Sequence, residues 1–212
     1  MDILGMPKED YSDAEHAEKF YEENRENGIS LCISKMSYTY HNGTKVFMRA
    51  DFEAHPHEIV ALVGPSGEGK TTLLRIMLAL LHIQSGDEDL VGAKTGEVLT
   101  ITPAARRLFS YVPQGNTMFS GTIAENMRNV RPDATDEEIK EVLIVSCAWE
   151  FVQKLPDGIY SKVGERGVGF SEGQAQRLSI ARALLRRAPI LLLDEATSAL
   201  CLLYTSPSPR DS

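Results

Sequence analysis

The amino-acid sequence predicts an α/β fold with a mostly parallel sheet, an N-terminal antiparallel β subdomain and an inserted α-helical subdomain. Two apolar runs indicate the parallel sheet: EIVALVG at residues 58–64 and ILLLDE at residues 190–195, each beside a helical stretch. Strands buried on both faces show such continuous runs rather than alternation. Of the 212 residues 42% are hydrophobic and 25% charged, which is typical of a soluble domain with a core.

The first hundred residues predict mainly strands. Residues 1–28 are rich in Glu, Lys and Asn and end at Asn27-Gly28, which indicates a solvated helix or a linker. SLCISKMSYTY and TKVFMRADFEAHP are strand-like runs, and His41-Asn42-Gly43 between them predicts a hairpin. After EIVALVG, the stretch TTLLRIMLALLHI has helical spacing, with Leu73, Leu80 and their neighbours on one face. Residues 86–112 again suggest strands.

The remaining elements are mainly helical. Thr135 with Glu138 forms a capping box for the predicted helix EEIKEVLIVSCAWEFVQKL, which Pro156-Asp157-Gly158 ends. A further helix, EGQAQRLSIARALLRR, ends before Pro189. The sequence thus places a helical subdomain at about residues 115–185.

Charge and apolar runs exclude several classes of function. The formal net charge of −8 argues against a nucleic-acid partner, which normally requires a basic surface. No apolar run approaches the ~20 residues that span a bilayer. The acidic N-terminus lacks the apolar core of a secretory signal. Cys32, Cys147 and Cys201 lie far apart and are interpreted as free thiols of a reduced compartment.

A glycine-rich motif follows the first apolar run. GPSGEGKTT at residues 64–72 fits G-x-x-x-x-G-K-[ST] between a predicted strand and a predicted helix, which makes a chance match improbable. Its glycines allow successive N–H groups to turn inward, and with the helix N-terminus they form an anion cradle. Lys70 would then contact the β- and γ-phosphates, and the Thr71 hydroxyl would coordinate Mg²⁺. The predicted cradle comprises Gly64, Pro65, Ser66, Gly67, Glu68, Gly69, Lys70, Thr71 and Thr72.

The second apolar run ends in two carboxylates. At the end of a buried strand beside a phosphate loop, Asp194 can hold Mg²⁺, and Glu195 can polarise a water for attack on the γ-phosphate. Without the upstream motif, the same pair could simply cap a neighbouring helix.

Together, FSEGQ, the following QR, the basic helix and ILLLDEATSAL closely resemble the LSGGQ signature region of ABC-type ATPases, over residues 29–200. The resemblance implies a P-loop NTPase core that binds and hydrolyses ATP, with two domains joined head to tail around two ATP molecules. Ser171, Gly173 and Gln174 would then bind the γ-phosphate held by the opposite domain. Glu172 and Phe170 depart from the LSGGQ pattern.

Two further residues take roles from the resemblance. Gln114 in YVPQGNTMF matches the catalytic glutamine loop, which touches Mg²⁺ and the attacking water and senses the membrane domain. Tyr40 matches the aromatic residue that stacks on adenine. Tyr38 is the alternative, and a place in the strand core would explain either tyrosine.

GNTMFSGTIAENM and GERGVGFSEGQ resemble the exporter branch, in which the ATPase follows a membrane-spanning domain on the same chain. Residues 1–28 would then be a linker from that domain, and the ATPase would lie at the cytoplasmic face of the cell membrane, although the fragment itself would be soluble. A separate ATPase subunit, a soluble ABC ATPase without transport, or a nucleotide binder without turnover are the alternatives.

The last twelve residues do not continue the pattern. The family expects Asp after SAL and a histidine about thirty residues later, whereas the sequence continues with Cys201. A back-translation of CLLYTSPSPRD resembles a transposase-library adapter, so residues 201–212 are predicted to be a non-native tail. A natural disordered Pro/Ser-rich tail is the alternative.

Overall fold

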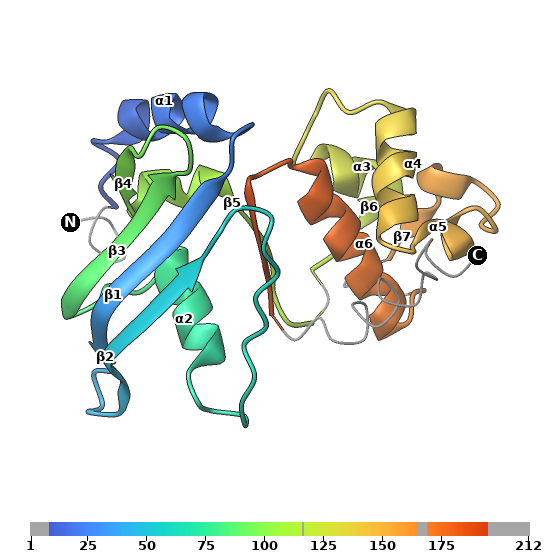
Figure 1. The fold of residues 1–212 in the computed structure, drawn as a ribbon. Helices are drawn as coiled ribbons and strands as arrows, with labels where there is room; N and C mark the ends of the chain where they lie inside the picture. The colour runs from blue at the N-terminus through green and yellow to red at the C-terminus, as the bar shows by residue number, and fades with distance from the viewer. Residues whose placement is uncertain (1–8, 116, 165–168, 195–212) are drawn as a thin grey trace, which may run out of the picture. The chain divides into compact units, whose positions relative to one another are not determined.

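The computed structural model describes residues 9–115, 117–164 and 169–194. The chain divides into two compact units, residues 1–109 and 110–212 (Figure 1). Glu195, the ERG stretch before the signature, and residues 201–212 therefore lie outside the described residues. The first unit contains α1 (Ala14–Asn24), β1 (Ile29–Thr39), β2 (Lys45–Ala54), α2 (Lys70–Met77), β3 (Ser85–Gly92), β4 (Val98–Thr100) and the 3₁₀ helix η1 (Pro103–Leu108).

An antiparallel sheet forms the body of the first unit, in the order β2-β1-β3-β4 (Figure 1). Leu31 of β1 pairs with Ala54 of β2 and Leu90 of β3, so alternate residues face the core. The predicted β1–β2 hairpin is confirmed: the Tyr40 N–H donates to the Thr44 carbonyl at 2.9 Å.

α1 occupies part of the segment expected to be solvated. Ala17, Phe20 and Asn24 are fully buried on one face of the helix, which packs against β4 and η1. The Asn24 amide donates to the Phe20 carbonyl at 2.9 Å, and its oxygen accepts from the Thr95 hydroxyl at 2.8 Å. α1 is thus packed against the rest of the first unit.

The expected buried strand at residues 58–64 is wrong. No strand forms there, and the side chains of Ile59 and Val63 are 76% and 93% exposed. A strand exists only where a neighbouring strand accepts and donates its backbone hydrogen bonds, and the described residues supply no such neighbour to this segment. Apolar content alone therefore gave the wrong assignment here.

α2 ends earlier than the apolar spacing predicts. The Leu80 N–H donates to the Arg75 carbonyl and the Ala79 N–H to the Ile76 carbonyl, with Ala79 in the left-handed region at φ 49°. These bonds make a Schellman motif, which usually has glycine where Ala79 stands. The predicted helical face consequently loses Leu80, whose side chain is exposed.

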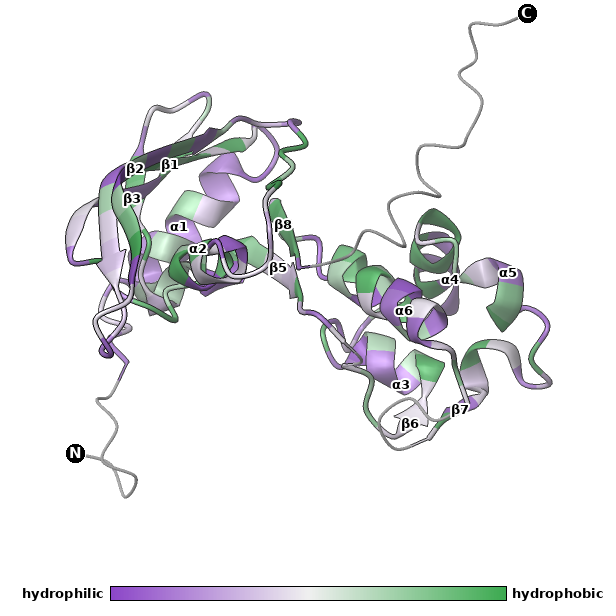
Figure 2. Cartoon of the chain, turned by 90° about the horizontal axis from the view of Figure 1, so that it is seen from below, coloured by the Kyte–Doolittle hydropathy of each residue, from purple (hydrophilic) through white to green (hydrophobic). Residues whose placement is uncertain are grey.

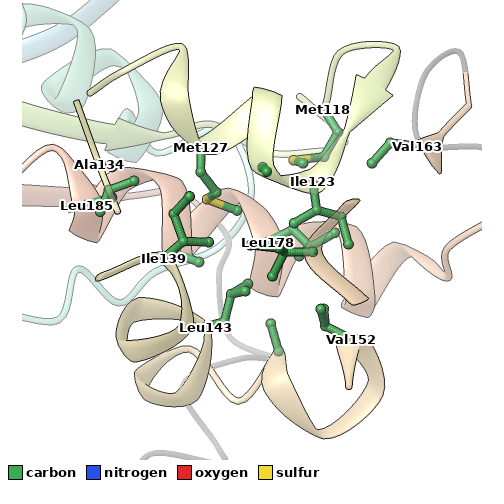
Figure 3. Close-up of a cluster of buried hydrophobic side chains, with 14 residues drawn as sticks. Met118, Ile123, Met127, Ala134, Ile139, Leu143, Val152, Val163, Leu178 and Leu185 are labelled. Carbon is green, nitrogen blue, oxygen red and sulfur yellow. The ribbon is translucent and has the colours of Figure 1, made fainter. Parts of the chain in front are cut away.

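The second unit holds the helices around the signature. Its elements are β5 (Phe109–Val112), which begins one residue before the unit boundary, β6 (Gly121–Thr122), α3 (Ile123–Arg128), α4 (Asp136–Val145), α5 (Trp149–Val152), η2 (Gly158–Tyr160), β7 (Lys162–Val163), α6 (Glu172–Leu185) and β8 (Ile190–Leu193). Met127, Ile139, Leu143 and Leu178 converge in its core (Figure 3). That core joins α3, α4 and α6 into one body.

The helix predicted over EEIKEVLIVSCAWEFVQKL is two helices. Its capping box is confirmed, since the Glu138 N–H donates to Thr135 Oγ1 at 3.2 Å and the Glu138 carboxylate accepts the Thr135 N–H at 3.1 Å. The break lies at Cys147, at φ 56°, where a second Schellman motif joins Ala148 to the Leu143 carbonyl. No glycine marks this stop in the sequence.

β5 pairs with β8 in a two-stranded sheet. β8 is apolar along its length (Figure 2), but it is not the fully buried strand that the sequence predicts, because only Leu192 is buried and Leu191 is 38% exposed. The Asp194 N–H donates to the Val112 carbonyl at 2.9 Å, so the C-terminal ends of the two strands meet. Among the described residues, no helix has both the length and the apolarity that crossing a bilayer requires.

Candidate functional site

The glycine-rich loop leads directly into α2. Gly67 and Gly69 have φ of 89° and 93°, a region that L side chains rarely adopt, and Gly69 is the N-cap of the helix. A Cβ at Gly69 would lie 2.6 Å from Val46 Cγ1. Both positions therefore require glycine. Such a loop can present the first backbone N–H groups of α2 to an anion.

The ammonium of Lys70 folds back over this loop. Its Nζ donates to the Gly64 carbonyl at 2.6 Å and to the Pro65 carbonyl at 2.7 Å. Because Lys70 is also the first residue of α2, its positive charge and the positive end of the helix dipole belong to the same short segment. This arrangement favours a polyanion.

Tyr40 ties the β1–β2 hairpin to α2. Its hydroxyl and Thr72 Oγ1 lie 2.8 Å apart, and the ring packs edge-on against Tyr38 at 5.1 Å between centroids. Tyr38 is buried, as a core residue would be, whereas Tyr40 keeps partial exposure. Of the two candidates for adenine stacking, Tyr40 is therefore the more accessible. The bond to Thr72 has no signal in the sequence, since 31 residues separate the two positions.

The second unit carries Gln114 and Asp194 just beyond the ends of β5 and β8. Asp194 is 6% exposed, and its Oδ2 accepts a hydrogen bond from the Tyr111 hydroxyl at 3.2 Å. Gln114 is exposed and lies two residues after Val112, whose carbonyl accepts the Asp194 N–H. The structure thus brings these two predicted residues to one end of the strand pair. Tyr111 was not predicted from the sequence as a partner of Asp194.

The signature segment starts α6 with a reciprocal cap. The Gln174 N–H donates to Ser171 Oγ at 3.3 Å, and the Ser171 N–H donates to Gln174 Oε1 at 3.0 Å. A Cβ at Gly173 would meet nothing within 4 Å, so this turn offers open space. Glu172, which replaces the usual glycine, stands in the first turn, where a carboxylate complements the helix dipole.

The first unit therefore holds Tyr40 and the loop of residues 64–72, whereas the second holds Gln114, Ser171, Gly173, Gln174 and Asp194. Sequence reasoning missed a group in the second unit: Thr117, three residues after Gln114, hydrogen-bonds to both Ser179 and Arg182. Thr117 lies 62 residues before Ser179, and Arg182 lies three residues after Ser179, and no sequence motif with these spacings could have revealed the group.

Similarity to known proteins gives independent evidence on the family of this chain. The profile of the family described as "ABC transporter" matches residues 47–198. A putative export ATP-binding/permease protein of Rickettsia felis is 38% identical over 188 residues, which are 85% of this chain and 31% of that protein. The mitochondrial iron-sulfur clusters transporter ATM1 of Debaryomyces hansenii is 41% identical over 168 residues, covering 79% of this chain and 24% of that protein.

A solved structure agrees with these relatives. A bacterial Atm1-family ABC exporter with ATP bound superposes with a TM-score of 0.73 at 32% identity, over 82% of this chain and 30% of that one. The chain thus spans about a third or less of the length of the relatives it matches. The mixed α/β fold, the glycine loop before α2 and the profile match agree, and the chain belongs to the ABC transporter family.

Proposed function

We propose that this chain is the ATP-binding and ATP-hydrolysing domain of an ABC exporter. The observation that carries the proposal is the Lys70 ammonium held against the Gly64 and Pro65 carbonyls in a loop that ends at the start of α2. Both the charge and the helix N-terminus suit the β- and γ-phosphates of a nucleoside triphosphate. Tyr40 would stack on the adenine.

Three further residues carry oxygen atoms that could bind Mg²⁺. The Thr71 hydroxyl, the Gln114 amide oxygen and the Asp194 carboxylate are all oxygen ligands, which Mg²⁺ prefers. Burial and the Tyr111 hydroxyl hold the Asp194 carboxylate in one orientation. Bound Mg²⁺ would neutralise charge on the phosphate oxygens during transfer.

Hydrolysis would use residues next to these ligands. We assign Glu195 the role of polarising the attacking water and Gln114 that of orienting it. β5 and β8 would belong to a mostly parallel core sheet, which the meeting of their C-terminal ends supports. Ser171, Gly173 and Gln174 at the start of α6 would bind the γ-phosphate held by a second ABC domain, in a head-to-tail dimer.

The whole protein would use this cycle to export a solute. The names of the relatives, export ATP-binding/permease proteins and ATM1 transporters, support a membrane-spanning partner domain. The domain would then work at the cytoplasmic face of the membrane. Closure of the dimer on ATP and its reopening after hydrolysis would be passed to that partner through the glutamine loop.

The test uses the 212-residue chain with Mg²⁺ and ATP, measured by calorimetry for binding and by phosphate release for turnover. Lys70→Ala should weaken binding at least about tenfold, because a charge-assisted contact to phosphate is lost. Glu195→Gln should leave binding intact and abolish turnover. Lys94→Ala, an exposed lysine of the same unit, is the matched control. Equal ATP affinity in the parent and Lys70→Ala would contradict the proposal.

A further inference from the structure

A directional chain of hydrogen bonds joins α6 to the segment after Gln114. Arg182 donates from Nη1 to the Thr117 carbonyl at 3.0 Å and from Nη2 to Thr117 Oγ1 at 2.7 Å. Thr117 Oγ1 and Ser179 Oγ lie 3.0 Å apart, and Ser179 Oγ donates to the Ala175 carbonyl at 3.0 Å. A hydroxyl has one proton to donate. The Ser179 proton is used on Ala175, so the Thr117 hydroxyl must donate to Ser179.

Thr117, Ser179 and Arg182 are shielded from solvent, so water cannot easily replace the hydrogen bonds among them. Ser179 is 3% exposed, and the half-buried Arg182 forms an ion pair with no carboxylate among the described residues. Burial lowers the pKa of Arg182. The ring of Phe119 covers the guanidinium at 5.4 Å. Thr117 is therefore the main hydrogen-bond acceptor that compensates this buried cation.

The same segment is also hydrogen-bonded to α3. The Phe119 N–H donates to Asn126 Oδ1 at 2.8 Å, and Asn126 Nδ2 donates back to the Phe119 carbonyl at 2.9 Å. Asn126 is almost fully buried. Residues 117–119 are thus fastened to two helices, three residues after the exposed Gln114.

The other end of this series of hydrogen bonds reaches the N-terminal cap of α6. The Ala175 carbonyl, which accepts the last hydrogen bond, is in the first turn of the helix, and the Ala175 N–H donates to the Ser171 carbonyl at 2.9 Å. A continuous path of hydrogen bonds therefore runs from the signature serine to the segment next to the glutamine loop. Such networks can couple two sites when both sites bias the same element.

We propose that Thr117, Ser179 and Arg182 form a latch that makes the start of α6 and the glutamine loop move as one body. The inference rests on the proposed function, in which Ser171 contacts the ATP of a second domain and Gln114 serves the ATP of its own domain. The latch would then report occupation of one ATP site to the other. Its three members are positioning residues, because they act on ATP only through Ser171 and Gln114.

The experiment is a double-mutant cycle read by hydrogen exchange of the 212-residue chain. Ser171→Ala loosens the cap of α6, and Thr117→Val removes the latch hydroxyl while keeping the side-chain shape. Thr117→Val should speed exchange of the amides of residues 117–122 by more than about fivefold, because it removes two hydrogen bonds and the loss of one alone has about a fivefold effect. Ser171→Ala should speed the same amides in the parent but add nothing in the Thr117→Val background.

Two controls separate coupling from general loosening. Thr117→Ser retains the hydroxyl and should restore the parent behaviour. Arg177→Lys also removes a bond between α6 and a backbone carbonyl, that of Cys147 at 3.2 Å, but lies outside the latch, so exchange of residues 117–122 should not change. If Thr117→Val unfolds the second unit, Arg182→Lys replaces it, because it keeps the charge and loses the two-pronged contact with Thr117.

An equal effect of Ser171→Ala in both backgrounds would overturn the latch, as would no effect in the parent. The proposed function is judged separately in the same samples. Protection of residues 64–72 by Mg²⁺ and ATP would support ATP binding whatever the cycle shows, and its absence would count against the proposed function and the reporting role that rests on it, but not against the mechanical coupling that the cycle measures.

Discussion

Glu88 is a buried carboxylate whose ionisation should weaken the first unit at neutral pH. It lies on β3 directly opposite Ile33 of β1, is 8% exposed, and its Oε2 has no hydrogen-bond partner in the described structure. Burial, and secondarily the charge of Asp89, raise the pKa of Glu88 from 4.5 to about 7. Replacing Glu88 with leucine should remove this cost.

The direction of the pKa shift determines how the unfolding free energy changes with pH. The folded state binds the proton more tightly than the unfolded chain, so the carboxyl does not disfavour folding below about pH 4.5. Its penalty grows as the pH rises from there to about 7 and is then constant. A difference of about 2.5 pKa units corresponds to about 3 kcal/mol of unfolding free energy.

Urea denaturation followed by far-UV circular dichroism at pH 5 and pH 8 measures this difference. Between the two pH values, the parent should lose about 2 to 3 kcal/mol more of unfolding free energy than Glu88→Leu loses. Asp87→Asn, an exposed carboxylate on the same strand, is the control and should follow the parent. Fluorescence of Trp149, the single tryptophan, reports the second unit in parallel. The same pH dependence in the parent and Glu88→Leu would refute the reasoning.

Three further changes test the site and the core. Tyr40→Phe should destabilise the first unit by about 1 to 2 kcal/mol in a urea titration, because the buried Thr72 hydroxyl loses its hydrogen-bond partner. The ATP affinity of this variant should equal that of the parent if only the ring of Tyr40 stacks on adenine. Gly69→Ala should lower ATP affinity at least about tenfold in calorimetry, since a Cβ there meets Val46 at a left-handed φ. Leu143→Ala should lower the unfolding free energy of the second unit by about 2 to 5 kcal/mol, measured by tryptophan fluorescence, because Leu143 is fully buried in the core. Ile144→Ala is the control and should lower it by less than about 1 kcal/mol, because the Ile144 side chain is 52% exposed.

The features that short sequence spacings encode were predictable. The capping boxes of Thr135 with Glu138 and of Ser171 with Gln174 each link residues three apart, so the motif and the hydrogen bonds coincide. The β1–β2 hairpin and the glycine loop before α2 are equally local, because Gly43, Gly67 and Gly69 adopt positive φ where the motifs require it.

Where the prediction failed, the deciding contact was distant or had no residue signature. Residues 58–64 have the composition of a buried strand, yet strand formation depends on a neighbour that composition does not specify. α2 and α4 end in Schellman motifs at Ala79 and Cys147, and neither residue is the glycine that normally marks such a stop.

The sequence by itself determined the family, the phosphate loop and the starts of α2, α4 and α6, because these depend on residues close together in the chain. Only the tertiary structure decided that Tyr40 bonds Thr72, that Glu88 is buried opposite Ile33, and that Arg182 holds Thr117. Each of those pairs is separated by more than thirty residues. Folding brings such residues together to bury apolar surface, and their polar groups must then find whatever partners the packing places beside them.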